Sequence, residues 1–68
     1  MQLQGQLVRI DPADEIRSNI VLLNPNGIED IIQTRNPDVL TVANTLIGKN
    51  VVATIEQGSQ PQITEIKN

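Results

Sequence analysis

Side chains able to carry out chemistry are few in this sequence. The chain contains no His and no Cys, so any nucleophile would be Ser18, Ser59 or a Thr without an imidazole base. Acid–base work would fall to the carboxylates clustered in residues 11–15 and 29–30. The first cluster lacks the alternating oxygen donors and the twelfth-position Glu of an EF-hand loop. We interpret both as solvated charge and predict a non-catalytic protein without a cofactor or a metal.

The charge balance argues against a phosphate backbone as the partner. Five Lys and Arg residues face eight Asp and Glu residues, which gives a net charge of −3. Nucleic acid would be repelled unless the cations gathered on one face. Stacking, worth about 1–3 kcal/mol per base, is excluded because the chain has no aromatic residue. Nucleic-acid binding is the disfavoured alternative, and its candidate cations are Arg9, Arg17, Arg35 and Lys49.

A chain of 68 residues forms at most one small domain. Its apolar residues are mainly Ile and Val, which favour sheet over helix bundle. Without disulfides or a zinc site, burial barely offsets an ordering entropy of about 1.5 kcal/mol per residue. We therefore expect either self-association or a protein partner.

The sequence carries no sign of export or of membrane association. Its first ten residues lack the basic start and the apolar run of a signal peptide. No apolar stretch approaches the roughly 20 residues that span a bilayer, and no basic amphipathic face is present. We predict a cytoplasmic protein that does not bind membranes.

The first half of the chain is patterned as strands. In residues 2–10 the apolar phase changes after Leu7, as expected of a strand that bulges near Gly5 and passes from one sheet to another; a short strand with a frayed start is the alternative. Residues 11–19 are polar and are expected to form a loop. The run 20–24 predicts a strand buried on both faces, and residues 24–27 predict a tight turn.

The second half combines one helix with two further strands. Residues 28–35 fit either a strand or a short helix, and we favour the strand because a hairpin turn precedes them. Asn36 and Pro37 suit the start of a helix, which we expect over residues 37–47 with Gly48 as its left-handed stop. Its predicted apolar face comprises Val39, Val42, Ala43, Leu46 and Ile47. Residues 51–56 and 62–67 then predict a closing hairpin, with a bulge or twist in its last strand.

This order of elements resembles that of an OB fold, a five-stranded barrel with a helix between its third and fourth strands. The stretch "TLIGKNVVATIEQGSQPQITEI" is similar to the segment in which an OB helix runs directly into the closing hairpin. We therefore predict a mainly β domain over residues 1–68, with an α+β fold as the alternative if residues 28–35 are helical. The resemblance implies a binding region that would include Arg17, Ser18, Asn19, Asn24, Gln57, Ser59 and Gln60.

By elimination, the sequence favours a protein-interaction or assembly module. Exposed strand edges and aliphatic surface both suit protein association. The expected edges are residues 2–8 and 62–67, because terminal strands are least often covered and neither segment contains Pro. Arg9 and Lys67 could instead protect these edges from pairing.

Overall fold

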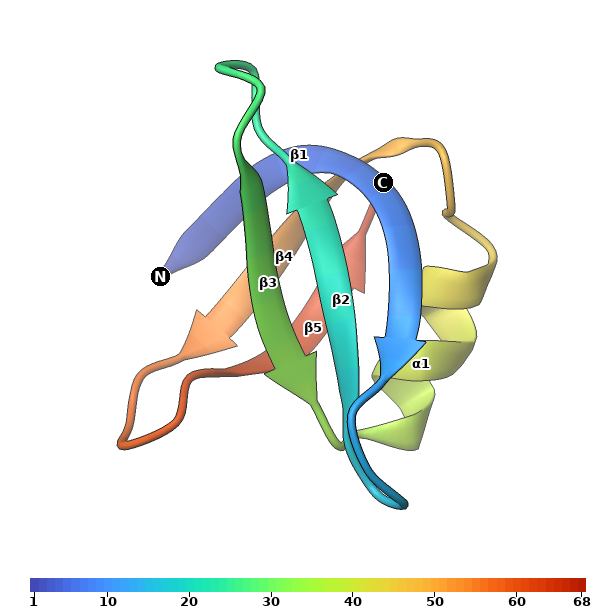
Figure 1. Cartoon of the computed structure of the whole chain (residues 1–68), viewed down its shortest axis with the longest axis vertical. Helices are drawn as coiled ribbons and strands as arrows, with labels where there is room; N and C mark the ends of the chain where they lie inside the picture. The colour runs from blue at the N-terminus through green and yellow to red at the C-terminus, as the bar shows by residue number, and fades with distance from the viewer.

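The computed structural model describes residues 1–68 and forms a closed β-barrel (Figure 1). Helix α1 (Pro37–Asn44) lies between the third and fourth strands, and the five strands are β1 (Gln2–Pro12), β2 (Ser18–Leu23), β3 (Glu29–Thr34), β4 (Asn50–Glu56) and β5 (Gln62–Lys67). Around the barrel the order is β1-β2-β3-β5-β4. The predicted mainly β, five-stranded barrel with one helix is confirmed, and its arrangement is consistent with an OB-like fold.

The ambiguous segment 28–35 forms a strand, so the helical alternative is wrong. β3 pairs antiparallel with β2, with Ile20 opposite Ile32. The turn between the two strands sets this register. The Asn24 side-chain oxygen accepts the backbone N–H groups of Asn26 at 2.9 Å and Ile28 at 3.2 Å, and Gly27 adopts a φ of +83°. A turn closed in this way aligns two β-branched segments for pairing and leaves no N-cap for a helix.

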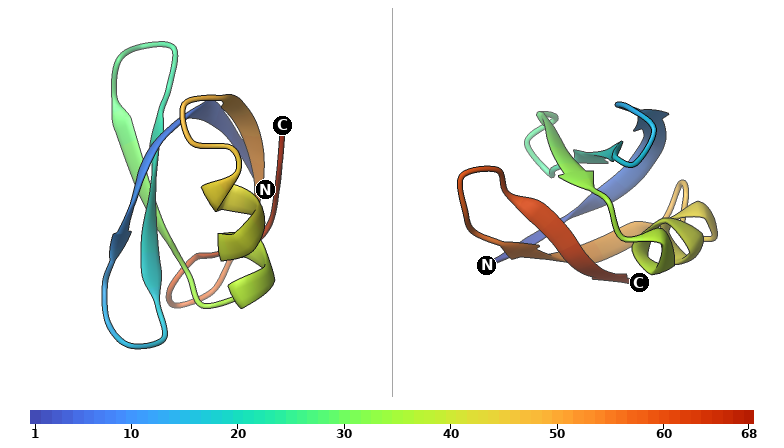
Figure 2. Two further views of the ribbon diagram at one scale, coloured as in Figure 1. Left: turned by 90° about the vertical axis from the view of Figure 1, so that its right-hand side faces the viewer. Right: turned by 90° about the horizontal axis from the view of Figure 1, so that it is seen from below.

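Strand β1 belongs to both sides of the barrel (Figure 2). Residues 2–6 pair with β4 and residues 6–12 pair with β2. The register shift that changes the apolar phase lies between Leu7 and Arg9, at Val8, whereas the sequence suggested a bulge nearer Gly5. Gly5 has a different role, because a Cβ atom at this position would lie 2.7 Å from the Leu23 carbonyl oxygen.

The barrel is completed by a short join between β3 and β5. The two strands are parallel and are bridged only at Gln33 and Gln62. Below the bridge, the buried Thr34 hydroxyl donates to the Ile63 carbonyl at 2.9 Å. The predicted irregularity in β5 is confirmed by a register shift opposite Thr54 and Ile55. It allows both Ile63 and Ile66 to face the core.

Helix α1 begins as the sequence predicts and ends earlier. Asn36 caps it, its side chain accepting the Asp38 N–H at 2.9 Å. The helix ends at Asn44 and not at residue 47, because the chain turns toward β1, where the Gly48 N–H donates to the Leu7 carbonyl at 2.7 Å. Gly48 has the expected left-handed φ of +88°. Two residues of the predicted apolar face are exposed: Ile47, which lies beyond the helix, and Val42, which lies within it.

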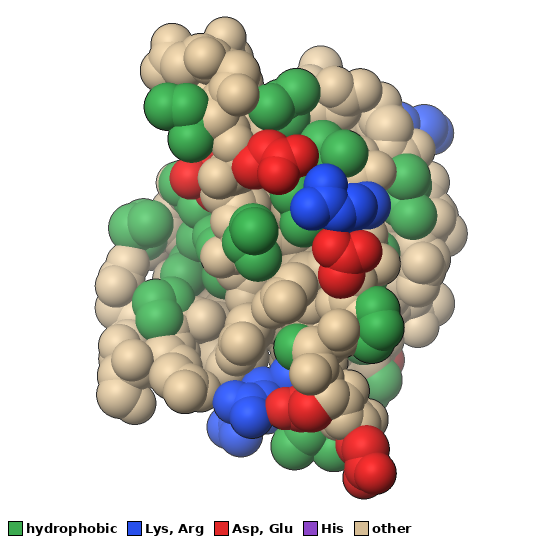
Figure 3. Space-filling model, in the orientation of Figure 1, with side chains coloured by type: hydrophobic (Ala, Val, Ile, Leu, Met, Phe, Trp, Pro, Cys, Tyr) green, Lys and Arg blue, Asp and Glu red, His purple; other side chains and the backbone are tan.

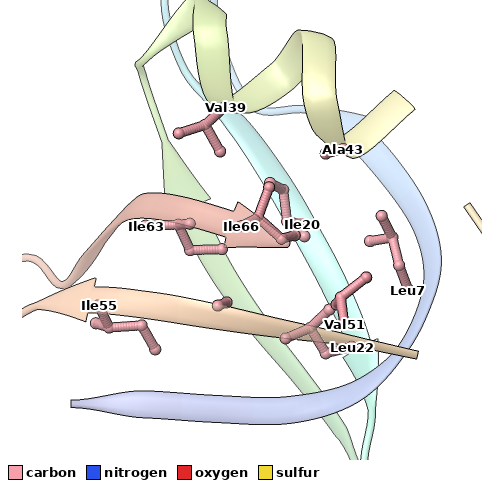
Figure 4. Close-up of a cluster of buried hydrophobic side chains, with 10 residues drawn as sticks. Leu7, Ile20, Leu22, Val39, Ala43, Val51, Ile55, Ile63 and Ile66 are labelled. Carbon is pink, nitrogen blue, oxygen red and sulfur yellow. The ribbon is translucent and has the colours of Figure 1, made fainter. Parts of the chain in front are cut away.

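The core lies between the inner faces of the strands and the underside of the helix (Figure 4). Val39 and Ala43 come from α1, and every strand except β3 supplies at least one further member of the buried cluster, which consists of Leu7, Ile20, Leu22, Val39, Ala43, Val51, Ala53, Ile55, Ile63 and Ile66. Ile32 of β3 packs against this cluster and is partly buried. The helix thus covers the aliphatic core where the strands leave it open.

Each of the strand edges predicted for association is paired along one side. Residues 2–6 are hydrogen-bonded along one side to β4, and β5 is paired with β4 on one side and packed against α1. The other side of β5 is bridged only at Gln62, and β2 pairs with β1 only from Gln6 onward, so the prediction that these segments serve as association edges stays untested. No helix here is both long and apolar enough to cross a membrane.

The contact at Gly5 predicts a position-specific effect of a methyl group. We expect Gly5→Ala to lower the free energy of unfolding by about 1–3 kcal/mol, because the new Cβ would overlap the Leu23 backbone. Gly58→Ala is the matched control, since a Cβ there meets nothing within 4 Å, and it should change stability by less than about 0.5 kcal/mol. Urea unfolding of both variants measures the difference. Equal effects would contradict the role given to Gly5.

Candidate functional site

The surface that best fits a binding site is the outer face of β1, β2 and β3, which is turned toward the viewer in Figures 1 and 3. Two loops border it: residues 13–17 between β1 and β2, and residues 57–61 between β4 and β5. Side chains alternate between the two faces of a strand, so the residues opposite the core set here are Arg9, Asp11, Asn19, Val21, Glu29, Ile31 and Gln33. We call this set the outer face.

An ion-pair network crosses the outer face. Arg9 on β1 contacts Asp11 at 2.9 Å and reaches over β2 to Glu29 on β3 at 3.3 Å. Val21 lies on β2 between Arg9 and Ile31 and is only 1% exposed. Hydrogen bonding to Asp11 and the charges of Asp11 and Glu29 raise the pKa of Arg9. The cation on this face is therefore neutralised by two carboxylates of the same surface.

The β1–β2 loop is held together by one carboxylate. Asp14 Oδ1 accepts the backbone N–H groups of Ile16 at 2.9 Å and Arg17 at 2.8 Å. Its other oxygen accepts the Arg17 side chain at 2.8 Å. The backbone bond from Ile16, aided by Arg17, lowers the pKa of Asp14. Arg17 is thus committed to a carboxylate, as Arg9 is.

A single side-chain contact joins the two bordering loops. Arg17 Nη1 donates to Gln60 Oε1 at 3.0 Å. Beside this contact lies an open hollow of about 320 Å³ between β3 and the β4–β5 loop, and its walls are Ile31, Ile32, Gln33, Ser59, Gln60 and Pro61. Its chemistry is aliphatic and amide, with one hydroxyl and no charged group.

The structure brings together only part of the predicted binding set. Arg17, Ser59 and Gln60 meet around the hollow, and Ser18 begins β2 beside them. Gln57 lies at the start of the same loop, where its amide contacts the Met1 sulfur at 2.9 Å. Arg9 lies on the outer face itself.

The remaining predicted residues lie elsewhere. Asn24 is in the β2–β3 turn, at the opposite end of β2 from the β1–β2 loop (Figure 1), and its side chain is used to close that turn. Arg35 lies between β3 and α1, and Lys49 between α1 and β4. Arg9 lies in β1, and the other three candidate cations lie in three different connections. Figure 3 shows blue groups at the upper right and at the lower left of this face, and those in the foreground lie against red ones.

Ile31, Ile32 and Gln33 are the residues of this region that sequence reasoning missed as binding candidates. They belonged to the segment whose helix or strand state was open. Once that segment is a strand, Ile31 points away from the core and is 58% exposed. An Ile that faces outward from a strand indicates a binding surface. This signal could be recognised only after the strand register showed which face of β3 is buried.

Few groups in the molecule suit catalysis or metal binding. No three His, Cys, Asp or Glu side chains come together as a potential metal site. Scans against protein-family models and searches of curated proteins and solved structures found no significant match.

The role of Asp14 predicts a pH-dependent contribution to stability. Because folding lowers its pKa, the stabilisation is present above the unfolded pKa of about 4 and is lost as pH falls through the lower folded value. We expect Asp14→Asn to be less stable than wild type at pH 7, and the difference to shrink in acid. Urea unfolding across that range measures it. Glu15→Gln removes a neighbouring carboxylate that makes no ion pair and should leave stability at pH 7 unchanged; a constant Asp14→Asn difference would contradict the assignment.

Proposed function

We propose that this chain is a non-catalytic protein-interaction module built on an OB-like barrel, and that it binds its partner through the outer face and the hollow beside the β4–β5 loop. The strand order and the helix between β3 and β4 support the OB assignment. In OB folds, strands two and three and the corresponding loops carry the ligand surface. The same region is used here.

The observation that carries this proposal is the neutralisation of both arginines near the site. Arg9 is paired with Asp11 and Glu29, and Arg17 with Asp14. What this surface offers a ligand is therefore amide and aliphatic groups, chiefly Ile31, Gln33 and Gln60. Such groups match a protein surface, where hydrogen bonds and apolar contact alternate. They match a phosphate backbone poorly, because its affinity comes from free cations.

Nucleic-acid binding is the second candidate, supported by the OB-like strand order. It would require the arginines to exchange their carboxylate partners for phosphates. It would also have to proceed without aromatic stacking. The protein-binding proposal is favoured on both grounds.

The two candidates differ in what a probe at the site should capture. We would place a photo-reactive amino acid at position 31 and express this variant in the source cells. We expect it to cross-link to one protein. That protein, once purified, should bind the purified chain directly. The same probe at exposed Lys67 is the matched control and should not give that adduct. In parallel, a labelled mixed-sequence oligonucleotide should not bind at physiological salt. Micromolar oligonucleotide binding that weakens steeply with salt, or a nucleic-acid adduct at position 31, would overturn the proposal.

A further inference from the structure

The edge of β3 that faces away from β2 carries free backbone groups. The Asn24 N–H donates to the Ile28 carbonyl at 3.0 Å, which fixes the alternation of the antiparallel pair. In the same register, Asp30 and Ile32 form the hydrogen-bonded pairs with β2. Glu29 and Ile31 form the pairs without hydrogen bonds, so their backbone N–H and C=O groups point away from β2, to the other edge of β3.

Strand β5 covers only the end of that edge. The β3–β5 bridge is confined to Gln33 and Gln62, and no turn or loop hydrogen bond reaches Glu29 or Ile31. No other strand is paired with this side of β3. Two residues of β3 therefore present unpaired donors and acceptors beside the hollow.

Lys, Pro and a β-bulge, which protect many strand edges, are missing at this position. β3 has the sequence EDIIQT, which contains neither Lys nor Pro, and its pairing with β2 has no bulge. Natural sheets commonly guard exposed edges by one of these devices. The charges on this edge are the carboxylates of Glu29 and Asp30, so a strand of another chain that pairs here must accommodate negative charge.

The side chains along the edge define the chemistry of an occupant. Ile31 is exposed on the outer side, where an aliphatic neighbour would cover it. On the inner side Asp30 is half-buried and makes no ion pair, whereas Glu29 lies on the outer side with Ile31 and is already paired with Arg9. The one cation nearby, Arg9, is already bound to Asp11 and Glu29. A complementary strand would therefore alternate aliphatic and basic residues.

We propose that the free edge of β3 is a docking strand, which adds a short extended segment of a partner protein with alternating aliphatic and Lys or Arg residues. This rests on the proposed function and specifies its partner. The aliphatic residues lie beside Ile31 and the hollow, and a basic residue faces Asp30. The available edge, residues 29–32, is about 13 Å long at about 3.3 Å per residue. That length accommodates about four residues of the added strand.

A blocked hexapeptide of alternating Lys and Val is the probe, and its binding is followed by the amide resonances of the labelled protein. We expect saturable shifts confined to residues 29–33 and 59–60, with slowed hydrogen exchange at the Ile31 amide. A peptide of the same composition with its three Lys and three Val in separate blocks is the control for net charge. Equal binding of the two peptides, or shifts elsewhere on the barrel, would overturn the proposal.

N-methylation tests the backbone pairing on the unaltered protein. An added antiparallel strand turns the N–H groups of its Val residues toward β3, and a parallel one turns those of its Lys residues. We expect methylation of either the Val amides or the Lys amides of the peptide, but not of both, to weaken binding. The loss should be about tenfold, because it removes one or two net hydrogen bonds. If neither set mattered, edge pairing would be wrong.

The matching protein variants are Ile31→Pro and Ile31→Val. Proline removes the free N–H at this edge but none of the bonds to β2, because Ile31 pairs with Val21 in a position without hydrogen bonds. We expect at least about a tenfold loss of peptide binding with Ile31→Pro and little change with Ile31→Val.

The outcomes separate this inference from the function on which it rests. A protein cross-link at position 31 together with no effect of methylation would leave the interaction module standing and remove the docking strand. Sedimentation across a hundredfold range of concentration tests the other occupant, a second copy of this chain. A dimer that the peptide cannot dissociate would replace the proposed partner and overturn the inference.

Discussion

The structure depends on the ability of one strand to pair with two neighbours. β1 leaves β4 at Gln6 and continues along β2, and the change is sterically allowed because residue 5 has no side chain to meet the Leu23 carbonyl. The register shift at Val8 then returns Ile10 to the inner face. Closure places β2 and β3 on one side and β4 and β5 on the other. The outer face, the hollow and the short β3–β5 join all follow from that division.

The charged groups of this small barrel satisfy one another near the site. Arg9 spans three strands to meet two carboxylates, and Asp14 orders its own loop before it meets Arg17. Exposed pairs of this kind add little stability. Their effect is on recognition, because they remove free positive charge and leave backbone edge, amide and aliphatic groups for a ligand to contact. Specificity on such a surface would come from shape and hydrogen bonding more than from attraction at long range.

Sequence patterns were sufficient for the order of elements because each depends on neighbours in the chain. The Asn24–Gly27 turn and the Asn36 cap are local signals, and both are present. Gly48 has the expected left-handed φ but does not end the helix. The end of α1 was misplaced because a contact with distant Leu7 decides it. Likewise, Arg17 and Gln60 could be placed together through the OB resemblance, whereas the Arg9–Glu29 pair and the free edge of β3 require the register between strands. Alternation within one segment cannot supply that register.

The pairing of the first strand with the fourth has a kinetic consequence. It brings Gln2 opposite Thr54 and Gln6 opposite Asn50, so the barrel closes only after most of the chain has been ordered. Contacts between residues so far apart in sequence slow folding, typically to milliseconds or seconds in small β domains. The β2–β3 hairpin, closed by a local turn, can form in about 1–10 μs. The edge of β3 is thus available for pairing long before the barrel is complete, and a partner segment present during synthesis would meet it first.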